Sequence, residues 1–327
     1  MQTRILTESE LRQVVGIGAE ALRAVESAFG WLQQDRVSMP PIMHIAARDR
    51  NGDIDVKSAY VKGLPYIAIK IAAGFSDNPV LGLPVGSAMM VVLSAQTGAC
   101  EAILLDNSFL TDLRTGLAGA VAAKHLAPRS VETVGVLGTG VQARIQVECL
   151  ALVRSFQKVV VWGRSKEKSD RYAGEMRERL GVEVEVATAP AEVVRASQLL
   201  ITATASERPL VLADSLHEGL HITAVGSDLP GKQELAPEVL LRADRLVCDR
   251  LAQCRTNGEV QHLLDGGGLP KGREIIELGE LTNGDKQGRQ REDEITVCDL
   301  TGTGVQDTAI ANLAYAAALE KNLGVLV

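Results

Sequence analysis

A glycine-rich turn near the middle of the chain constrains the fold more than any other feature. The motif G-x-G-x-x-A directly follows an apolar run, Val134–Leu137, and opens a helical pattern that continues to Leu150. Its first glycine allows the turn, its second lets the backbone approach a pyrophosphate, and its small last residue lets the helix pack against the strand. The motif consists of Gly138, Thr139, Gly140, Val141, Gln142 and Ala143. It predicts a dinucleotide-binding β-α unit, and an ordinary strand–helix turn is the alternative.

The residues around this motif alternate between apolar runs and helical patterns. Parallel strands that are covered on both faces need continuous apolar runs, and the helical segments supply the crossovers. We therefore predict an α/β fold with a doubly wound parallel sheet, of the Rossmann type, over residues 131–304. The Gly- and charge-rich stretch Asp265–Asp293 within it is predicted to be a loop. The predicted strands are Thr133–Leu137, Lys158–Trp162, Val182–Ala187, Leu199–Ala203, Ile222–Gly226, Leu246–Asp249 and Ile295–Leu300.

The first part of the chain follows a different pattern. Thr7 and Glu10 resemble a capping box, which predicts that the chain opens with helices. Short β-rich runs separated by turn residues then predict a mainly antiparallel sheet. Helices are expected over Thr111–Leu126 and Gln306–Glu320, and the second of these could pack back on the first half. Residues 1–130 with 305–327 are therefore predicted to form an α+β domain. Its predicted strands are Ile42–Ala46, Asp55–Val61, Tyr66–Ile71 and Ala88–Leu93.

Length, charge and composition exclude several classes of protein. The chain has 327 residues, about twice a typical domain of roughly 150, which favours two domains. A formal charge of -7 gives no basis for nucleic-acid binding. The longest apolar stretch falls short of the roughly 20 residues that cross a bilayer, so we expect a cytoplasmic protein that does not bind membranes. The cysteines and histidines lack metal-ligand spacing, which predicts no metal site.

The residues after the second Rossmann strand bear on the choice of cofactor. A site selective for NAD carries Asp or Glu there to bind the ribose 2′-hydroxyl. This chain has Arg164, Ser165 and Lys166 instead, and two cations favour a 2′-phosphate. NADP(H) is therefore the favoured cofactor, and NAD(H) is left open. The alternative is that Arg164 and Lys166 are only solvent-exposed residues of a loop and do not contact the cofactor.

Segments spread in order over nearly the whole chain resemble the ornithine cyclodeaminase/mu-crystallin family. They are Met39–Pro41, Ala68–Lys70, Leu110–Thr115, Gly138–Ala143 and Ala224–Lys232. Further segments are most similar to the ectoine-utilisation and iminosuccinate-reductase branch, namely Asn51–Lys57, Gly74–Pro79, Leu105–Asn107 and Asp299–Asp307. The resemblance implies an N-terminal substrate and dimerisation domain that the C-terminal helix completes, an inserted Rossmann domain, and a homodimer.

The resemblance also implies a substrate site. The family's substrate clamp corresponds to Lys70 and Arg114, and its catalytic carboxylate corresponds to Asp228. Arg114 can hold a substrate carboxylate through two parallel hydrogen bonds, and Lys70 adds a second cation. A carboxylate beside an imine nitrogen can supply or remove a proton. Taken singly, Lys70 could extend along a strand, Arg114 could cap a helix and Asp228 could cap a turn.

Further candidates rest on the resemblance and on strand alternation. Many family members carry an arginine shortly after the segment Met39–Pro41, whereas this chain has His44, which could bind a carboxylate or be structural. Asp55 and Lys57 lie near the family's second acidic residue, and alternation places them on one strand face with Asp53.

Three small residues complete the cofactor candidates. Thr202 and Thr204 end the fourth Rossmann strand, where small residues can border a nicotinamide. Gly302 lies in a turn that the family brings toward the cofactor. Loop packing is the alternative role for each of them.

Together with the dinucleotide motif, the resemblance implies an NAD(P)H-dependent imine reductase that forms a small α-amino acid from its imino acid, with iminosuccinate, which gives aspartate, as one candidate substrate. In this mechanism Arg114 and Lys70 hold the substrate carboxylate and Asp228 handles a proton. Two alternatives are left open. One is an ornithine-type cyclodeaminase that uses catalytic NAD. The other is a non-catalytic, NADP-dependent protein that binds a small ligand, like mu-crystallin.

Overall fold

The structure, a computed structural model, describes residues 2–327, and the chain divides into two compact units. The terminal unit combines the residues up to Arg114 with Thr303–Val327, and the central unit is Thr115–Gly302. The first division falls inside helix α3 (Phe109–Leu126). The sequence places this boundary at residue 130, just beyond the end of the same helix, and the second boundary at residue 304.

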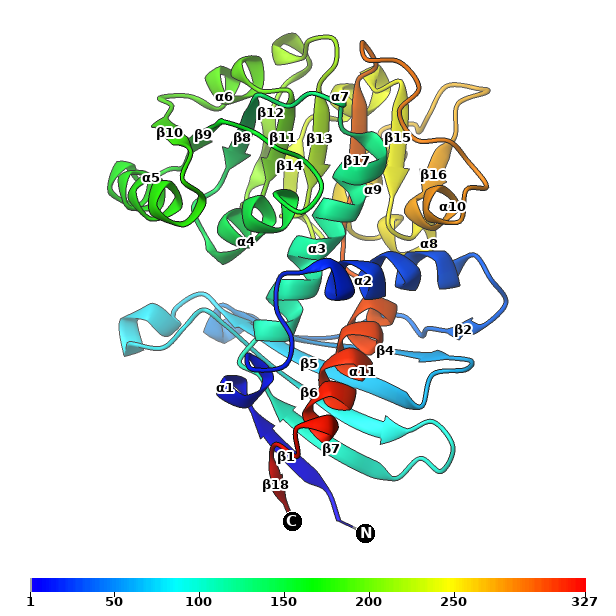
Figure 1. The fold of residues 1–327 in the computed structure, drawn as a ribbon. Coiled ribbons are helices and arrows are strands. Elements are labelled where there is room, and N and C mark those ends of the chain that lie inside the picture. Colours follow the sequence, from blue (N-terminus) through cyan, green and yellow to red (C-terminus); the bar gives the residue numbers. More distant parts are fainter. Residues whose placement is uncertain (1) are drawn as a thin grey trace. The chain divides into compact units, whose positions relative to one another are not determined.

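An eight-stranded parallel sheet forms the centre of the central unit (Figure 1), in the order β10-β9-β8-β11-β13-β17-β15-β16. The strand order reverses between β8 and β11, and open α/β sheets bind ligands at such a point, outside the carboxyl ends of the strands. The Rossmann-type fold predicted from the sequence is confirmed. The strands are β8 (Thr133–Leu137), β9 (Lys158–Trp162), β10 (Glu183–Val186), β11 (Leu199–Thr202), β13 (His221–Ala224), β15 (Arg245–Cys248), β16 (Ile275–Glu277) and β17 (Thr296–Asp299).

Helices bury both faces of this sheet, which explains its continuous apolar strands. Val159 and Val161 of β9 belong to one hydrophobic core, and Val160 between them belongs to another. Side chains alternate between the two faces of a strand, so every position needs an apolar residue. The remaining elements of the unit are α4 (Val141–Leu150), α5 (Lys166–Leu180), α6 (Pro190–Ala196), β12 (Glu207–Val211), β14 (Gln233–Leu235), α7 (Pro237–Arg242), α8 (Leu251–Cys254), α9 (Gly258–Asp265) and α10 (Leu278–Thr282).

The stretch Asp265–Asp293 is more ordered than predicted, because it contains β16 and α10. Glu277 ties the stretch to the rest of the unit, since its carboxylate accepts a hydrogen bond from Arg250 Nη1 at 2.7 Å. The prediction of a loop was wrong here. A strand of only three residues, paired with the distant β15, leaves too short an apolar run to be detected in the sequence.

The sheet of the terminal unit is mainly antiparallel, as predicted. Its order is β18-β1-β7-β6-β5-β4-β2, with β3 also paired with β4, and β1 and β7 are parallel partners. The strands are β1 (Arg4–Thr7), β2 (Val37–Ser38), β3 (Met43–Ala47), β4 (Gly52–Val61), β5 (Tyr66–Phe75), β6 (Gly86–Ser94), β7 (Cys100–Leu105) and β18 (Val325–Leu326).

The described chain opens with strand β1 and not with a helix, contrary to the prediction. The backbone N–H of Thr7 does donate to Glu10 Oε2 at 2.9 Å, as a capping box requires, but helix α1 (Glu8–Leu11) is a single turn. The longer helix α2 (Ala19–Leu32) follows. The strand partners β7 and β18 lie far along the chain, so a four-residue segment does not reveal its pairing.

Helices α2 and α11 (Gly304–Glu320) pack on one face of this sheet, where α11 crosses β4 and β5 (Figure 1). A Cβ atom at Gly304 would lie 2.5 Å from the carbonyl oxygen of Ser58, so α11 begins in direct contact with β4. One buried cluster joins the three elements through Ala28, Ala59, Val61, Val305 and Ala309.

The other face of the same sheet carries exposed apolar side chains. Alternation turns Met43 and Ile45 of β3, Met89 of β6 and Leu105 of β7 away from the helices, and all four are exposed.

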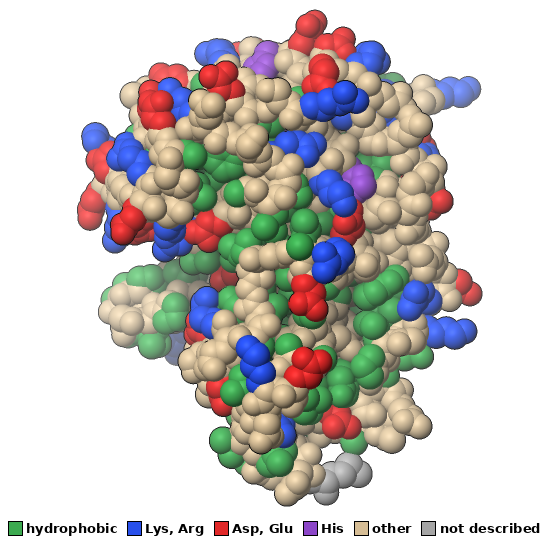
Figure 2. Space-filling model, in the orientation of Figure 1, with side chains coloured by type: hydrophobic (Ala, Val, Ile, Leu, Met, Phe, Trp, Pro, Cys, Tyr) green, Lys and Arg blue, Asp and Glu red, His purple; other side chains and the backbone are tan. Residues whose placement is uncertain are grey.

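On the central unit, positive and negative side chains are interspersed over the face seen in Figure 2. Among residues 2–327, no helix is long and apolar enough to span a bilayer.

Candidate active site

A buried cluster of charged side chains lies in the terminal unit. Lys57 and Lys70 lie opposite each other on β4 and β5, Arg114 comes from α3, and Asp307 comes from the first turn of α11. Asp307 Oδ1 accepts a hydrogen bond from Arg114 Nε at 2.8 Å, and Oδ2 lies 3.3 Å from Lys70 Nζ. None of the four residues is more than 7% exposed. The structure thus gathers three predicted site residues around a carboxylate that the sequence analysis did not single out.

Three cations surround one carboxylate in this cluster. Burial lowers the pKa of Lys70 to about 7; Asp307 opposes this shift, and Arg114 and Lys57 add to it. Burial by itself would raise the pKa of Asp307, but Arg114, Lys70 and Lys57 hold it below its usual value. Buried charges are costly unless they are paired. Lys70 and Arg114 share the carboxylate of Asp307, so the site suits a ligand that brings a carboxylate of its own.

Two further buried groups near the cluster have polar atoms without a hydrogen-bond partner among residues 2–327. These atoms are Nε2 of Gln306, which precedes Asp307, and Oδ1 of Asp106. The other oxygen of Asp106 caps α3 by accepting from the backbone N–H of Leu110 at 2.8 Å. Burial raises the pKa of Asp106 to about 7. Buried polar atoms normally have a protein or water partner, so both atoms can receive a ligand or a water.

His44 and Asp55 form a pair on the same face of the sheet as the lysines. The two residues are register partners on β3 and β4, and His44 Nδ1 lies 2.8 Å from Asp55 Oδ1. The register of β4 against β5 is unbroken from Gly52 to Ala59, so alternation places Asp55 and Lys57 on one face. The carboxylate of Asp55 is therefore engaged with His44.

The glycine motif of the central unit forms the turn between β8 and α4. Gly138 has φ 118°, and a Cβ atom there would lie 2.5 Å from the carbonyl oxygen of Ala203. A Cβ at Gly140 would meet nothing within 4 Å, so the backbone at the start of α4 faces open space. Ala143 is buried and its carbonyl accepts from Tyr172 at 2.9 Å. These features fit a pyrophosphate at the helix N-terminus.

A residue missed by the sequence analysis holds this turn in place. Arg144 Nη1 donates to the carbonyl oxygen of Thr139 at 2.6 Å, and its Nε donates to Glu175 at 2.7 Å. Val141 is exposed in the first turn of α4, and Gln142 Oε1 accepts from Gln146 at 3.4 Å. Arg144 directly follows the last residue of the motif, where the dinucleotide-binding pattern specifies no arginine. Only the fold therefore reveals its role.

The three residues after β9 have different surroundings. Ser165 caps α5 and accepts a hydrogen bond from the backbone N–H of Lys168 at 3.3 Å. Lys166 Nζ pairs with Asp170 at 2.6 Å. Arg164 is exposed. Of the two cations singled out from the sequence, Lys166 already has a counter-charge on its own helix.

The carboxyl ends of β11 and β13 are joined by a buried carboxylate, Glu234. It accepts hydrogen bonds from the hydroxyl groups of Thr202 and Thr204 at 2.6 and 2.7 Å. These hydroxyls therefore serve the protein's own packing. Asp228 follows β13 in the same region, its side chain is 46% exposed, and its Oδ1 lies 2.7 Å from Lys232 Nζ.

The turn that contains Gly302 is also anchored by a buried carboxylate. Asp249, which follows β15, accepts from the backbone N–H groups of Thr301 and Gly302 at 2.8 and 2.7 Å. Gly302 has φ 76°, which favours glycine. Sequence analysis did not identify Glu234 or Asp249, because each acts on a backbone that only the fold brings near.

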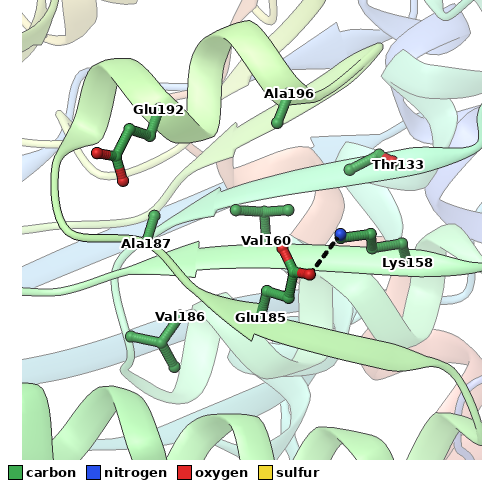
Figure 3. A pocket seen from close by; sticks show the side chains of 8 residues that line it. All are labelled: Thr133, Lys158, Val160, Glu185, Val186, Ala187, Glu192 and Ala196. Carbon is green, nitrogen blue, oxygen red and sulfur yellow. Dashed lines mark ion pairs between the residues drawn. The ribbon is translucent and has the colours of Figure 1, made fainter.

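A hollow of about 250 Å³ lies elsewhere on the central unit, against β9, β10 and α6 (Figure 3). Lys158 and Glu185 line it and form an ion pair of 2.7 Å with each other. None of the predicted site residues lines this hollow. Among residues 2–327, no group of three or more His, Cys, Asp or Glu side chains could hold a metal ion.

The reversed strand order and the glycine turn at the start of α4 define a Rossmann-type protein. The chain belongs to the ornithine cyclodeaminase/mu-crystallin family, whose sequence profile matches residues 1–322. The resemblance predicted from its motifs is confirmed. An uncharacterized cyclodeaminase of Sinorhizobium fredii is 44% identical, over 99% of this chain and 98% of that protein.

Three solved structures share the fold over almost their whole length. The Delta(1)-pyrroline-2-carboxylate reductase of Thermococcus litoralis, in complex with NADH and L-proline, has a TM-score of 0.94 at 30% identity, covering 99% of this chain and 100% of that one. An archaeal alanine dehydrogenase dimer with bound NAD has a TM-score of 0.92 at 34% identity, covering 100% and 99%. The iminosuccinate reductase of Paracoccus denitrificans, in complex with NAD+, has a TM-score of 0.91 at 27% identity, covering 100% and 99%.

Proposed function

We propose that this protein is an NAD(P)H-dependent imine reductase that forms a small α-amino acid from its 2-imino acid. The observation that carries the proposal is the buried pair of cations Lys70 and Arg114, which share the single carboxylate of Asp307. A 2-imino acid brings the carboxylate that such a cluster needs. Two of the similar proteins, pyrroline-2-carboxylate reductase and iminosuccinate reductase, are named for reactions on C=N bonds.

In the proposed mechanism the terminal unit holds the substrate. Arg114 and Lys70 bind the substrate carboxylate, and Asp307 keeps both cations in position from the opposite side. When bound, the reduced nicotinamide supplies the hydride that the imine carbon accepts. Asp228 delivers a proton to the nitrogen, directly or through a water, so that the C=N bond becomes CH–NH. His44 and Asp55 are proposed to contact the substrate side chain, and iminosuccinate is one candidate substrate.

The proposed cofactor is NADP(H), with NAD(H) as the alternative. The turn from Gly138 to Ala143 would hold the pyrophosphate against α4. Arg164 is exposed just beyond β9, at a point where an NAD-selective site carries an acidic residue. The turns at Thr202–Thr204 and Gly302 are proposed to border the nicotinamide through their backbones, since both threonine hydroxyls are bound to Glu234.

We propose that the protein is a homodimer that pairs through the exposed apolar face of the terminal sheet. Met43 and Ile45 lie on this face, 60% and 50% exposed, and apolar surface of this kind is typical of an interface. The archaeal alanine dehydrogenase is itself a dimer. Light scattering should give twice 34.8 kDa, and a monomer would contradict the proposal.

The experiment that tests the function measures consumption of reduced nicotinamide. The purified protein is mixed with NADPH or NADH, ammonia and a panel of 2-oxo acids, including oxaloacetate, pyruvate and glyoxylate, and with cyclic imines. Ammonia-dependent loss of absorbance is expected for at least one 2-oxo acid, and the preferred acid identifies the substrate side chain. The Arg114→Ala variant should lose this activity and still bind the cofactor.

Other outcomes separate the alternatives. If no absorbance is lost but ammonia is released from ornithine in the presence of catalytic NAD, the protein is a cyclodeaminase. If NADPH binds tightly and neither reaction occurs, the protein binds a small ligand without catalysis. Equal losses of substrate use and cofactor binding in Arg114→Ala would contradict the role of Arg114.

A further inference from the structure

Four hydrogen-bond donors converge on one buried carboxylate in the central unit. Glu234, in β14, is fully buried. Its Oε1 accepts from the backbone N–H and the hydroxyl of Thr204, at 2.6 and 2.7 Å. Its Oε2 accepts from the hydroxyl of Thr202 at 2.6 Å and from the backbone N–H of Gly226 at 2.9 Å. One carboxylate therefore links the carboxyl ends of β11 and β13.

The two loops that Glu234 joins are packed against each other. A Cβ atom at Gly226 would lie 2.2 Å from the carbonyl oxygen of Thr204 and 2.6 Å from the carboxyl carbon of Glu234. There is thus no space for a side chain at this position. The separation of the two strand ends is set by direct contact as well as by the shared carboxylate.

The segment from Gly226 to Glu234 closes on itself around Asp228. Ser227, which is buried, donates its hydroxyl to the carbonyl oxygen of Lys232 at 2.7 Å. Lys232 Nζ in turn donates to Asp228 Oδ1 at 2.7 Å. Since Gly226 and Glu234 are bonded to each other, the position of Asp228 depends on that bond.

A second carboxylate, that of Glu259, binds the backbone of Glu234. Glu259 accepts from the backbone N–H groups of Glu234 and Leu235 at 2.8 and 3.0 Å. Burial raises the pKa of Glu234, and its hydrogen bonds with Thr202, Thr204 and Gly226 oppose the shift. Each carboxylate oxygen faces one backbone N–H, which can only donate, so both oxygens must accept.

We infer that Glu234 is a positioning residue for the reaction, which fixes Asp228 and the loop after β11 in one arrangement without touching the substrate. This inference rests on the proposed function, because it assumes that Asp228 handles the proton. Proton transfer depends steeply on geometry, and a displacement of about 1 Å can cost about 100-fold in rate. A carboxylate that holds two loops at once restricts such displacement.

The variant Glu234→Gln tests the inference. A glutamine has one accepting oxygen, so its amide group faces the N–H of either Thr204 or Gly226 whichever way it turns, and one strand end is released. The expected result is a fall in kcat of about 100-fold. The Kd for reduced nicotinamide should rise by a smaller factor than kcat falls, because the hydrogen bonds of Glu234 go to Thr202, Thr204 and Gly226 and the pyrophosphate turn begins at Gly138. A kcat within about 3-fold of the wild type would overturn the inference.

Glu294→Gln is the matched control. Glu294 is only 2% exposed and accepts from the backbone N–H of Gln290 at 2.8 Å and from Arg245 Nε at 3.1 Å. It precedes β17, at the amino end of the strands, so its loss should lower Tm and leave kcat unchanged. Equal losses of kcat in the two variants would assign Glu234 a merely structural role and overturn the inference.

Amide hydrogen exchange makes the test independent of turnover. In Glu234→Gln the amide of Thr204 or that of Gly226 should exchange faster than in the wild type, and unchanged exchange at both would overturn the inference. If the wild type reduces no imino acid, the proposed function fails while this measurement still decides the positioning. Should Glu234→Gln not fold, Thr202→Val removes a single donor to the same carboxylate and is expected to give a smaller loss of kcat.

Discussion

Arg114 and Asp307 lie 193 residues apart in the chain and are joined by a 2.8 Å hydrogen bond inside the terminal unit. The bond ties α3 to the first turn of α11, and both partners are almost fully buried. With Lys70 3.3 Å from the other oxygen, Asp307 is the counter-charge on which the cation cluster depends. The substrate contacts proposed for Arg114 and Lys70 therefore rest on a residue near the C-terminus.

Replacing Asp307 by asparagine should destabilise the protein strongly. The variant removes the carboxylate that Lys70 and Arg114 share, and breaking a buried ion pair by removal of one partner costs about 3–5 kcal/mol. Urea denaturation measures the change in unfolding free energy. The exposed Asp214→Asn serves as control and should change it by less than about 0.5 kcal/mol. If Asp307→Asn is as stable as the wild type, the carboxylate of Asp307 does not stabilise the buried cations, and the prediction is wrong.

The activity should depend on pH through Lys70. The pKa of Lys70 is about 7 in the folded protein, so the side chain loses its positive charge, and its hold on a substrate carboxylate, as pH rises through that value. We expect kcat/KM to fall above about pH 7 in the wild type, and this fall should disappear in Lys70→Arg, because arginine stays charged. Asp106→Asn is the control for the other group with a pKa near 7 and should keep the fall. A fall that survives in Lys70→Arg contradicts the assignment.

The same shift makes a prediction about stability. Lys70 has a pKa of about 7 when folded, below its usual 10.5, so the unfolded chain binds more protons between these two values. The unfolding free energy contributed by this group therefore rises as pH increases from about 7 toward 10.5. Comparing the pH dependence of urea denaturation in the wild type and in Lys70→Met isolates this contribution. Parallel curves for the two proteins would refute it.

Arg164→Ala should weaken NADPH binding more than NADH binding. The guanidinium lies beyond β9, where it can pair with a 2′-phosphate that NADH lacks, and a loss of about 10-fold in NADPH affinity is expected. Lys166→Ala is a close control, because Lys166 is already paired with Asp170 and should contribute less. Fluorescence titration with both cofactors measures the effect. Equal losses for NADPH and NADH would favour NAD(H) as the cofactor.

Gly138→Ala should abolish cofactor binding. Its φ of 118° and the 2.5 Å approach of the added Cβ to Ala203 force the turn to move. Gly174→Ala, within α5, provides the contrast, because its Cβ would meet nothing within 4 Å. That substitution should raise the unfolding free energy by about 0.5–1 kcal/mol, measured by denaturation, and leave binding unchanged. Retained binding in Gly138→Ala would argue against the turn as the pyrophosphate site.

The Rossmann unit could be predicted almost strand by strand because its signals are local. Both faces of the sheet are buried, so strands such as Lys158–Trp162 are apolar at nearly every position, and the predicted bounds of β8 and β9 agree with the structure. The glycine motif adds a constraint on a few adjacent residues. In contrast, β1 and β16 are short strands that are stabilised by distant partners, and no local pattern identifies them.

The residues of the candidate site also fall into two groups, those that local sequence motifs reveal and those that only the fold reveals. Lys70, Arg114 and Asp228 were identified through motifs that are continuous in sequence, and their roles stay predictions. Asp307, Glu234 and Asp249 act on residues brought near them by folding, and a carboxylate in isolation gives no sign of which cation or backbone N–H it will meet. Local sequence patterns specify elements and turns, because these depend on residues within a few positions of one another. The pairing of buried charges depends on which strands and helices pack together, and that is settled only when the whole core forms.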